Sequence, residues 1–287
     1  MELIHFQGLN CYHDCIVTLA NAFGLDYTKA FSTLWSEGNL RYDLICQVFL
    51  TCRMPDTLEA MGMKLESPCI LMSDKENGFE NTQNGCYIIA GMDAYHIPWN
   101  PLYKLHHGPH YFIAEKGDGE QQTCFDPTYG LYGQKYSAHL LVSLSYALIP
   151  VKKIKASPAF LEETTDLSDQ ALEVLKTHKK TLDHFLCQAK IWIGGSEDTK
   201  VLPAKYIDGL MTGRYMYKQF LKARQIEPDN AGLFYSRSYY SQWQAVKSGF
   251  YKAALKNKDK AAYDEACSLL VRLFDQEILL AKQILNM

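Results

Sequence analysis

The chain has 287 residues and a formal net charge of −3 at pH 7, with 47% hydrophobic, 13% aromatic and 21% charged residues. This composition supports a sizeable core and excludes an intrinsically disordered chain. The balance of 29 basic against 32 acidic residues argues against a nucleic-acid-binding protein that depends on phosphate neutralisation. No apolar run approaches the roughly 18 residues of a membrane span, and the first residues lack a signal-peptide pattern. We therefore expect a cytoplasmic protein without membrane association.

The nine cysteines are scattered along the chain, and no Cys-x2-Cys pair occurs among them. In a reducing cytoplasm they are expected to be free thiols. A structural zinc site is not expected, because such sites use closely spaced ligand pairs. We expect neither a metal nor a bound cofactor.

Two parts of different composition meet in the segment 150–158. Residues 1–156 contain 12 of the 18 glycines and 7 of the 10 prolines. Turn-forming residues are thus concentrated in the first part, while the second has the apolar spacing of helices. We predict a first domain over residues 1–156 and a second over residues 157–287.

A helix is predicted to begin after Asn10, which suits the N-cap position, and to stop at Gly24. Apolar residues at three- and four-residue steps support it: Ile16, Leu19, Ala20 and Phe23. His13 and Asp14 are expected on the solvent-exposed surface of this helix. A second helix is expected over residues 27–37.

Three strands are expected next, over residues 86–92, 111–115 and 122–125, because these segments are rich in β-branched and aromatic residues. The last two flank Gly117–Gly119, which is a hairpin signal. Helices followed by an antiparallel sheet indicate the α+β class. The second part is predicted to be an all-α helical domain built from four long periodic segments: 168–190, 208–223, 238–255 and 259–285.

Cys11 lies in the first turn of the predicted N-terminal helix. The unpaired N–H groups and the dipole at a helix start favour a negative charge, so this thiol is expected to be more nucleophilic than an ordinary cysteine. Cys15 lies one turn further along and is expected to be buried. A single cysteine is also commonly a small core hydrophobe, and this alternative stays open for Cys11.

His110 and Asp126 lie on either side of the predicted hairpin. If a three-residue loop is centred on Asp118, the two side chains face each other directly, within hydrogen-bonding range. The carboxylate would then orient the imidazole, as in a nucleophile–His–Asp triad. The alternative is that His110 is an exposed loop histidine and that Asp126 belongs to an ordinary Asp-Pro turn.

Three motifs in this order resemble the butirosin biosynthesis protein H N-terminal family, over roughly residues 8–150. They are Asn10-Cys11 with Asn21 and Phe23-Gly24; Gly91-Met-Asp-Ala-Tyr-His-Ile-Pro98 with His106-His-Gly-Pro-His110-Tyr-Phe-Ile113; and Cys124-Phe-Asp126-Pro127. The resemblance implies a papain-like cysteine-protease-type core, with Cys11 as nucleophile, His110 as general base and then acid, and Asp126 as the orienting residue.

The chain departs from the pattern of these proteins at two places. Asn10 stands where the family often has histidine. Papain and the bacteriocin-leader peptidases, to which a fainter likeness extends, place an oxyanion glutamine six residues before the cysteine, whereas Gln7 lies four residues before Cys11. Backbone N–H groups at the helix start, including that of Cys11, are therefore the expected oxyanion donors.

The activity that this resemblance implies is acyl transfer in natural-product (antibiotic) biosynthesis. An acyl group would move from the phosphopantetheine thioester of an acyl or peptidyl carrier protein to Cys11, and then to an amine or other nucleophile of a small-molecule acceptor. The same three residues would also serve a cysteine peptidase, an amidase, or a thioesterase or cyclase. A non-catalytic carrier-binding module is a further alternative.

Overall fold

The computed structural model describes residues 1–43, 47–157, 166–226, 228–255 and 259–286. Contacts between residues divide the chain into two compact units. Unit 1 comprises Met1–Tyr27 and Pro55–Glu163, and unit 2 comprises Thr28–Met54 and Thr164–Met287. Each contains helices and strands, so the mixed α+β class is confirmed. The predicted boundary at residues 156 and 157 differs from this division, because residues 28–54 join the later helices.

Unit 1 is built on a six-stranded sheet in the order β3-β8-β4-β5-β6-β7, and every neighbouring pair is antiparallel. The strands are β3 (Met63–Leu65), β4 (Tyr87–Asp93), β5 (Pro109–Glu115), β6 (Gln121–Asp126), β7 (Leu131–Ser137) and β8 (Ser145–Lys153). The three strands expected from the sequence are β4, β5 and β6, within one or two residues at their ends. Of these, β4 and β5 are almost continuously buried, as their apolar sequences require, whereas burial alternates along β6.

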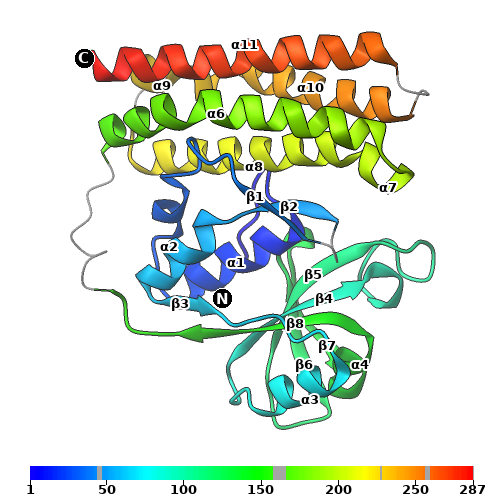
Figure 1. Ribbon diagram of the computed structural model, residues 1–287. Helices are drawn as coiled ribbons and strands as arrows, with labels where there is room; N and C mark the ends of the chain where they lie inside the picture. The colour runs from blue at the N-terminus through cyan, green and yellow to red at the C-terminus, as the bar shows by residue number, and fades with distance from the viewer. Residues whose placement is uncertain (44–46, 158–165, 227, 256–258, 287) are drawn as a thin grey trace. The chain divides into compact units, whose positions relative to one another are not determined.

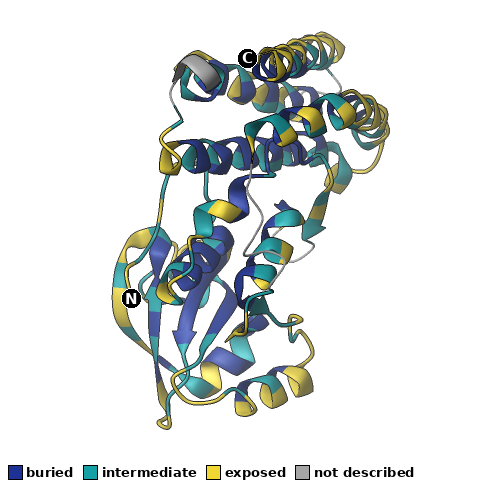
Figure 2. Cartoon of the chain, turned by 90° about the vertical axis from the view of Figure 1, so that its left-hand side faces the viewer, coloured by how far each residue is buried: buried dark blue, intermediate teal, exposed yellow. Residues whose placement is uncertain are grey.

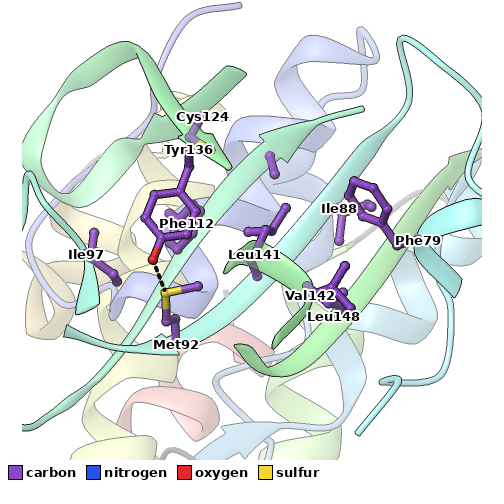
Figure 3. Packing of buried hydrophobic residues seen from close by; sticks show 12 residues of the cluster. Phe79, Ile88, Met92, Ile97, Phe112, Cys124, Tyr136, Leu141, Val142 and Leu148 are labelled. Atoms are coloured by element: carbon purple, nitrogen blue, oxygen red, sulfur yellow. Dashed lines mark hydrogen bonds between the residues drawn. The ribbon is translucent and has the colours of Figure 1, made fainter. Parts of the chain in front are cut away.

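Helix α1 (Cys11–Ala22) lies against β4 and β5, whereas α3 (Met72–Glu80) and α4 (Ala138–Leu144) pack onto β8 and its neighbours (Figure 1). Side chains alternate along β5, so this strand contributes residues to both faces of the sheet. The ring of Tyr111 lies 5.1 Å from that of Tyr12 in α1. The next residue, Phe112, belongs to the apolar cluster beneath α3 and α4 (Figure 3). The sheet is therefore covered on both faces.

The cluster in Figure 3 fills the side of the sheet that α3 and α4 cover. Phe79 comes from α3, Leu141 and Val142 come from α4, and the remaining members come mainly from the strands. Within it, the Tyr136 hydroxyl lies 3.4 Å from the Met92 sulfur and also donates to the backbone oxygen of His96. The cluster supports the ends of β5 and β6, where two of the predicted site residues lie.

Unit 2 contains four long helices that run side by side in Figure 1: α6 (Leu167–Gly194), α8 (Leu202–Ala223), α10 (Arg237–Leu255) and α11 (Lys260–Leu285). All four were expected from the sequence. Figure 2 shows their amphipathic character, with buried residues on one side and exposed residues on the other. Among the described residues, this unit also has the short helices α7 (Glu197–Lys200) and α9 (Pro228–Tyr235).

Residues 28–54 supply the remaining parts of unit 2, so this unit also contains strands, whereas the elements described from residue 167 on are all helices. Strands β1 (Leu40–Asp43) and β2 (Val48–Thr51) form a hairpin that packs on α8. Gly209 of α8 permits this approach, because a Cβ there would lie 2.7 Å from Leu40 and 3.0 Å from the backbone oxygen of Phe49. Helix α2 (Arg53–Met61) follows the hairpin.

The prediction of a helix over residues 27–37 is also wrong. The structure has a 3-10 helix over Tyr27–Phe31, and the chain continues through tight turns to Ser36. Residues 30–37 are buried with the exception of Thr33, so the segment does not bury one face and expose the other as a surface helix does. Trp35 packs against rings of α8 and α9, at 5.5 Å from Tyr217 and 5.4 Å from Phe234.

A buried ionic network lies within the helices of unit 2. Glu277 accepts hydrogen bonds from Arg214 at 3.0 Å and from His178 at 2.6 Å, and Tyr239 donates to it as well. All four side chains are at most 1% exposed. A buried carboxylate is tolerated only when it is paired and fully hydrogen-bonded, which is the arrangement found here. Arg214 is the main reason that the pKa of Glu277 falls to about 2 despite burial.

Across the described residues, no helix combines the length and the apolar character needed to cross a bilayer. Within the same part of the chain, no group of three or more His, Cys, Asp or Glu side chains is arranged to hold a metal ion.

Candidate active site

Cys11 is the first residue of α1, as predicted. Asn10 is the N-cap, and its side chain accepts a hydrogen bond from the backbone N–H of His13 at 2.9 Å. This cap fixes the start of the helix, so the thiol lies where the helix dipole favours negative charge. The side chain of Cys11 is partly exposed, whereas Cys15 is fully buried and burial raises its pKa well above the ordinary value. Of the two cysteines, only Cys11 is accessible to a substrate.

His110 is hydrogen-bonded to both of the other predicted site residues. Its Nε2 lies 2.7 Å from Oδ2 of Asp126, and the thiol of Cys11 is a second hydrogen-bond partner of the same ring. Because Asp126 occupies Nε2, the nitrogen left for the sulfur is Nδ1. The structure thus brings Cys11, His110 and Asp126 together, in that order across the imidazole.

The surroundings of His110 favour its protonated form. Burial of the ring disfavours the charge, but the hydrogen bonds to Asp126 and Cys11, together with the negative charge of both groups, outweigh it. The pKa of His110 rises to about 9 as a result. At neutral pH the ring is therefore an imidazolium, which can stabilise a neighbouring thiolate and can give a proton to a leaving group.

Asp126 is fully buried and is held by a second donor that the sequence analysis missed. The indole Nε1 of Trp99 donates to Oδ2 at 2.9 Å, so this oxygen serves both His110 and Trp99. Oδ1 of Asp126 has no hydrogen-bond partner among the described residues. Trp99 lies in the loop after β4, where no periodic pattern marks it as a partner of a carboxylate.

The predicted register of the hairpin is wrong by two residues. The ladder pairs Ile113 with Phe125 and Glu115 with Thr123, so His110 is not directly opposite Asp126. The loop is longer than three residues because a hydrogen bond spans it. The side-chain oxygen of Gln122 in β6 accepts from the backbone N–H of Gly117 at 2.7 Å. The regular ladder ends at Ile113 and Phe125, and β6 has an irregularity between Cys124 and Asp126, so His110 and Asp126 meet beyond the regular pairing.

A further buried carboxylate connects the helix of Cys11 to the turn after Asp126. Asp14 accepts from Thr128 Oγ1 at 2.7 Å and contacts His5 Nδ1 at 3.0 Å. Thr128 is in the 3-10 turn that follows Asp126 directly, and Asp14 is one turn after Cys11. This hydrogen bond therefore helps to fix the nucleophile relative to the orienting carboxylate.

The expectation that His13 and Asp14 face solvent is wrong, because both are at most 1% exposed. Burial lowers the pKa of His13 to about 3, and neither ring nitrogen has a hydrogen-bond partner among the described residues. Burial likewise raises the pKa of Asp14. Only one face of α1 had been assigned to the core, whereas the sheet and the turn after β6 cover more of it. His13 stays neutral and is not a candidate acid or base at neutral pH.

Tyr129 lies beside His110. The two rings are 5.3 Å apart, and Tyr129 is 41% exposed. A hydrogen bond links Tyr129 to Asn100, and burial raises the pKa of this phenol. Gln7 is exposed. The backbone N–H of Cys11, at the first turn of α1, remains the natural oxyanion donor.

Comparison with known proteins gives no family for the chain. No protein-family model matches it, and no curated protein matches it.

Proposed function

We propose that the protein is a cysteine-dependent acyltransferase, with Cys11 as nucleophile, His110 as acid and base, and Asp126 as the residue that orients His110. The observation that carries this proposal is the position of one imidazole, hydrogen-bonded both to a thiol at a helix start and to a buried carboxylate. A structural cysteine needs neither partner. The same arrangement supports nucleophilic catalysis on several unrelated folds.

In the first half of the reaction, the Cys11 thiolate attacks the carbonyl carbon of an acyl thioester. The tetrahedral intermediate collapses with cleavage of the carbon–sulfur bond, and protonated His110 gives its proton to the departing thiolate. The backbone N–H of Cys11 stabilises the oxyanion. The product is an acyl group on Cys11 and a free thiol.

In the second half, an amine attacks the acyl-Cys11 thioester. Neutral His110 accepts the proton that the amine loses, and an amide forms as the carbon–sulfur bond to Cys11 breaks. Cys11 returns to the thiolate beside protonated His110. A thioester exchanges with a thiol at little cost, whereas the final amide is more stable, so the overall direction is towards transfer.

The resemblance noted in the sequence extends this proposal to the partners. The donor would be the phosphopantetheine thioester of an acyl or peptidyl carrier protein, and the acceptor a small natural-product intermediate. The core of unit 1 would be papain-like, since α1 carries the nucleophile and the sheet carries the histidine and its carboxylate. No cofactor beyond the donor's own pantetheine is required.

Acyl loading from a simple pantetheine thioester tests the proposal. Mixing the protein with an acyl-pantetheine should add one acyl mass per chain, detected by intact-mass spectrometry. Cys11→Ala should abolish the adduct, and Cys187→Ala, which removes an exposed cysteine of unit 2, should not. Loading that persists in Cys11→Ala would end this proposal. If the loaded enzyme releases its acyl group to water as fast as to amines, the activity is hydrolysis by the same three residues.

A further inference from the structure

Two pockets of unit 2 adjoin each other. The first has a volume of about 460 Å³ and the second about 240 Å³. Both are lined by Gly38, Asn39 and His184, so the two pockets meet along these residues. Neither belongs to the cysteine site, which lies in unit 1.

The larger pocket is basic. Lys176, Lys180 and His184 follow one another at four-residue steps of α6, so they lie along one side of the helix. Arg53 faces them from the start of α2. No residue that the structure describes as lining this pocket is acidic.

Arg53 is held in place by neutral and charged partners. Its Nη1 donates to the Ser36 hydroxyl at 2.7 Å and to the backbone oxygen of Thr33 at 3.2 Å. Nη2 lies 3.5 Å from a carboxylate oxygen of Glu173, which offsets part of one positive charge. Glu37, whose carboxylate accepts from the backbone N–H of Arg53 at 3.0 Å, offsets a further part. The two lysines and the arginine still outnumber these two carboxylates, which suits an anionic ligand.

The smaller pocket is aromatic. The four-residue series on α6 continues through Gln188 to Trp192, and both line this pocket. Phe49 and Tyr206 are each 7% exposed and pack against the ring of Trp192, with ring centroids 5.9 and 6.2 Å from it. Trp192 itself is half-buried, so a heteroaromatic ring can stack on its exposed side and hydrogen-bond to the amide of Gln188.

We propose that these adjoining pockets bind an adenine nucleotide that carries a diphosphate, with the phosphates at Lys176, Lys180 and Arg53 and the base beside Trp192. From Lys180 to Gln188 the helix rises by about 12 Å, which matches the span from a diphosphate to the base it carries. The ligand is either a free nucleotide or the nucleotide part of coenzyme A. This inference is independent of the cysteine chemistry of unit 1.

Calorimetric titration tests the proposal, using ADP, desulfo-coenzyme A, adenosine and inorganic pyrophosphate as probes. The full chain carrying Cys11→Ala is used, so the result does not depend on acyl transfer. ADP or desulfo-coenzyme A should bind more tightly than either adenosine or pyrophosphate, and binding should weaken as salt is raised. Tighter binding of ADP identifies a free nucleotide as the ligand, and tighter binding of desulfo-coenzyme A identifies the coenzyme.

Variants locate the binding. Replacing both lysines with glutamine (Lys176→Gln with Lys180→Gln) should weaken binding at least about tenfold, and Trp192→Leu should weaken it by about fivefold or more. Lys179→Gln is the matched control, since Lys179 is exposed on α6 but does not line the pocket. The proposal is overturned if no probe binds at millimolar concentration, if pyrophosphate binds as tightly as the nucleotides, or if the double lysine variant binds like Lys179→Gln.

Discussion

Asp126→Asn tests the pairing of His110 with a buried carboxylate. The substitution keeps the size of the side chain but removes its charge, which is one of the factors that raise the pKa of His110 to about 9. The ring stays buried, so its pKa should fall toward 6.5 or lower in the variant. A fall of about 2 pKa units corresponds to about 3 kcal/mol of lost preference for the imidazolium.

Two measurements follow from this change. NMR titration of the His110 ring gives its pKa directly, and the rate of acyl loading at pH 7 should fall by about 10²- to 10⁴-fold. Glu120→Gln is the control. It removes the charge of an exposed glutamate on the loop between β5 and β6, and it should leave both the pKa of His110 and the rate of acyl loading unchanged. If His110 in Asp126→Asn still titrates near 9, or if loading stays within threefold of the parent rate, the reasoning fails.

The same pairing makes the free energy of unfolding depend on pH. The folded pKa of His110 lies above its value of about 6.5 in the unfolded chain. Protonation of His110 therefore stabilises the fold fully below about pH 6.5, and this contribution is lost as the pH rises through about 9. Denaturant unfolding should show this loss in the parent protein, and Asp126→Asn should show much less of it.

Three further predictions concern positioning and stability. Trp99→Phe removes one donor to Asp126 and should lower the loading rate about tenfold with little change in the fold, whereas an unchanged rate would show that His110 alone holds the carboxylate. Thr128→Val leaves buried Asp14 with one donor fewer and should cost about 1–3 kcal/mol of stability, measured by denaturant unfolding and contradicted by an unchanged midpoint. Glu277→Gln leaves Arg214 buried without its counter-charge and should cost about 3–5 kcal/mol, whereas exposed Glu265→Gln should cost less than about 0.5 kcal/mol. Equal losses in these two glutamate variants would contradict the importance of the buried network.

The contact between His110 and Asp126 that the sequence predicted is present, although the predicted hairpin register is wrong. The hairpin brings the start of β5 and the end of β6 together, and this survives a shift of two residues in the register. The length of the loop depends on Gln122, whose hydrogen bond to Gly117 is a tertiary detail that turn preferences do not contain. The contact itself could thus be expected, but its geometry could not.

Other features were beyond the sequence because they depend on long-range contacts. Residues 28–54 have the composition of the first part, yet Trp35 packs among rings of α8 and α9. Trp99 and Asp14 support the site through partners 27 and 114 residues away in sequence. Periodicity identifies the apolar face of a single helix, but it does not say which polar side chains a distant turn will cover.

The rate of alkylation of Cys11 by iodoacetamide at pH 7 is the most direct test of the central claim, that Cys11 is activated by the His110–Asp126 pair. Peptide mapping separates it from the exposed cysteines Cys52 and Cys187. The account predicts that Cys11 reacts at least about tenfold faster than either, because a thiolate and not a thiol is the reactive form, and that His110→Ala removes this difference. Equal, slow labelling of all three cysteines in the parent protein would contradict it.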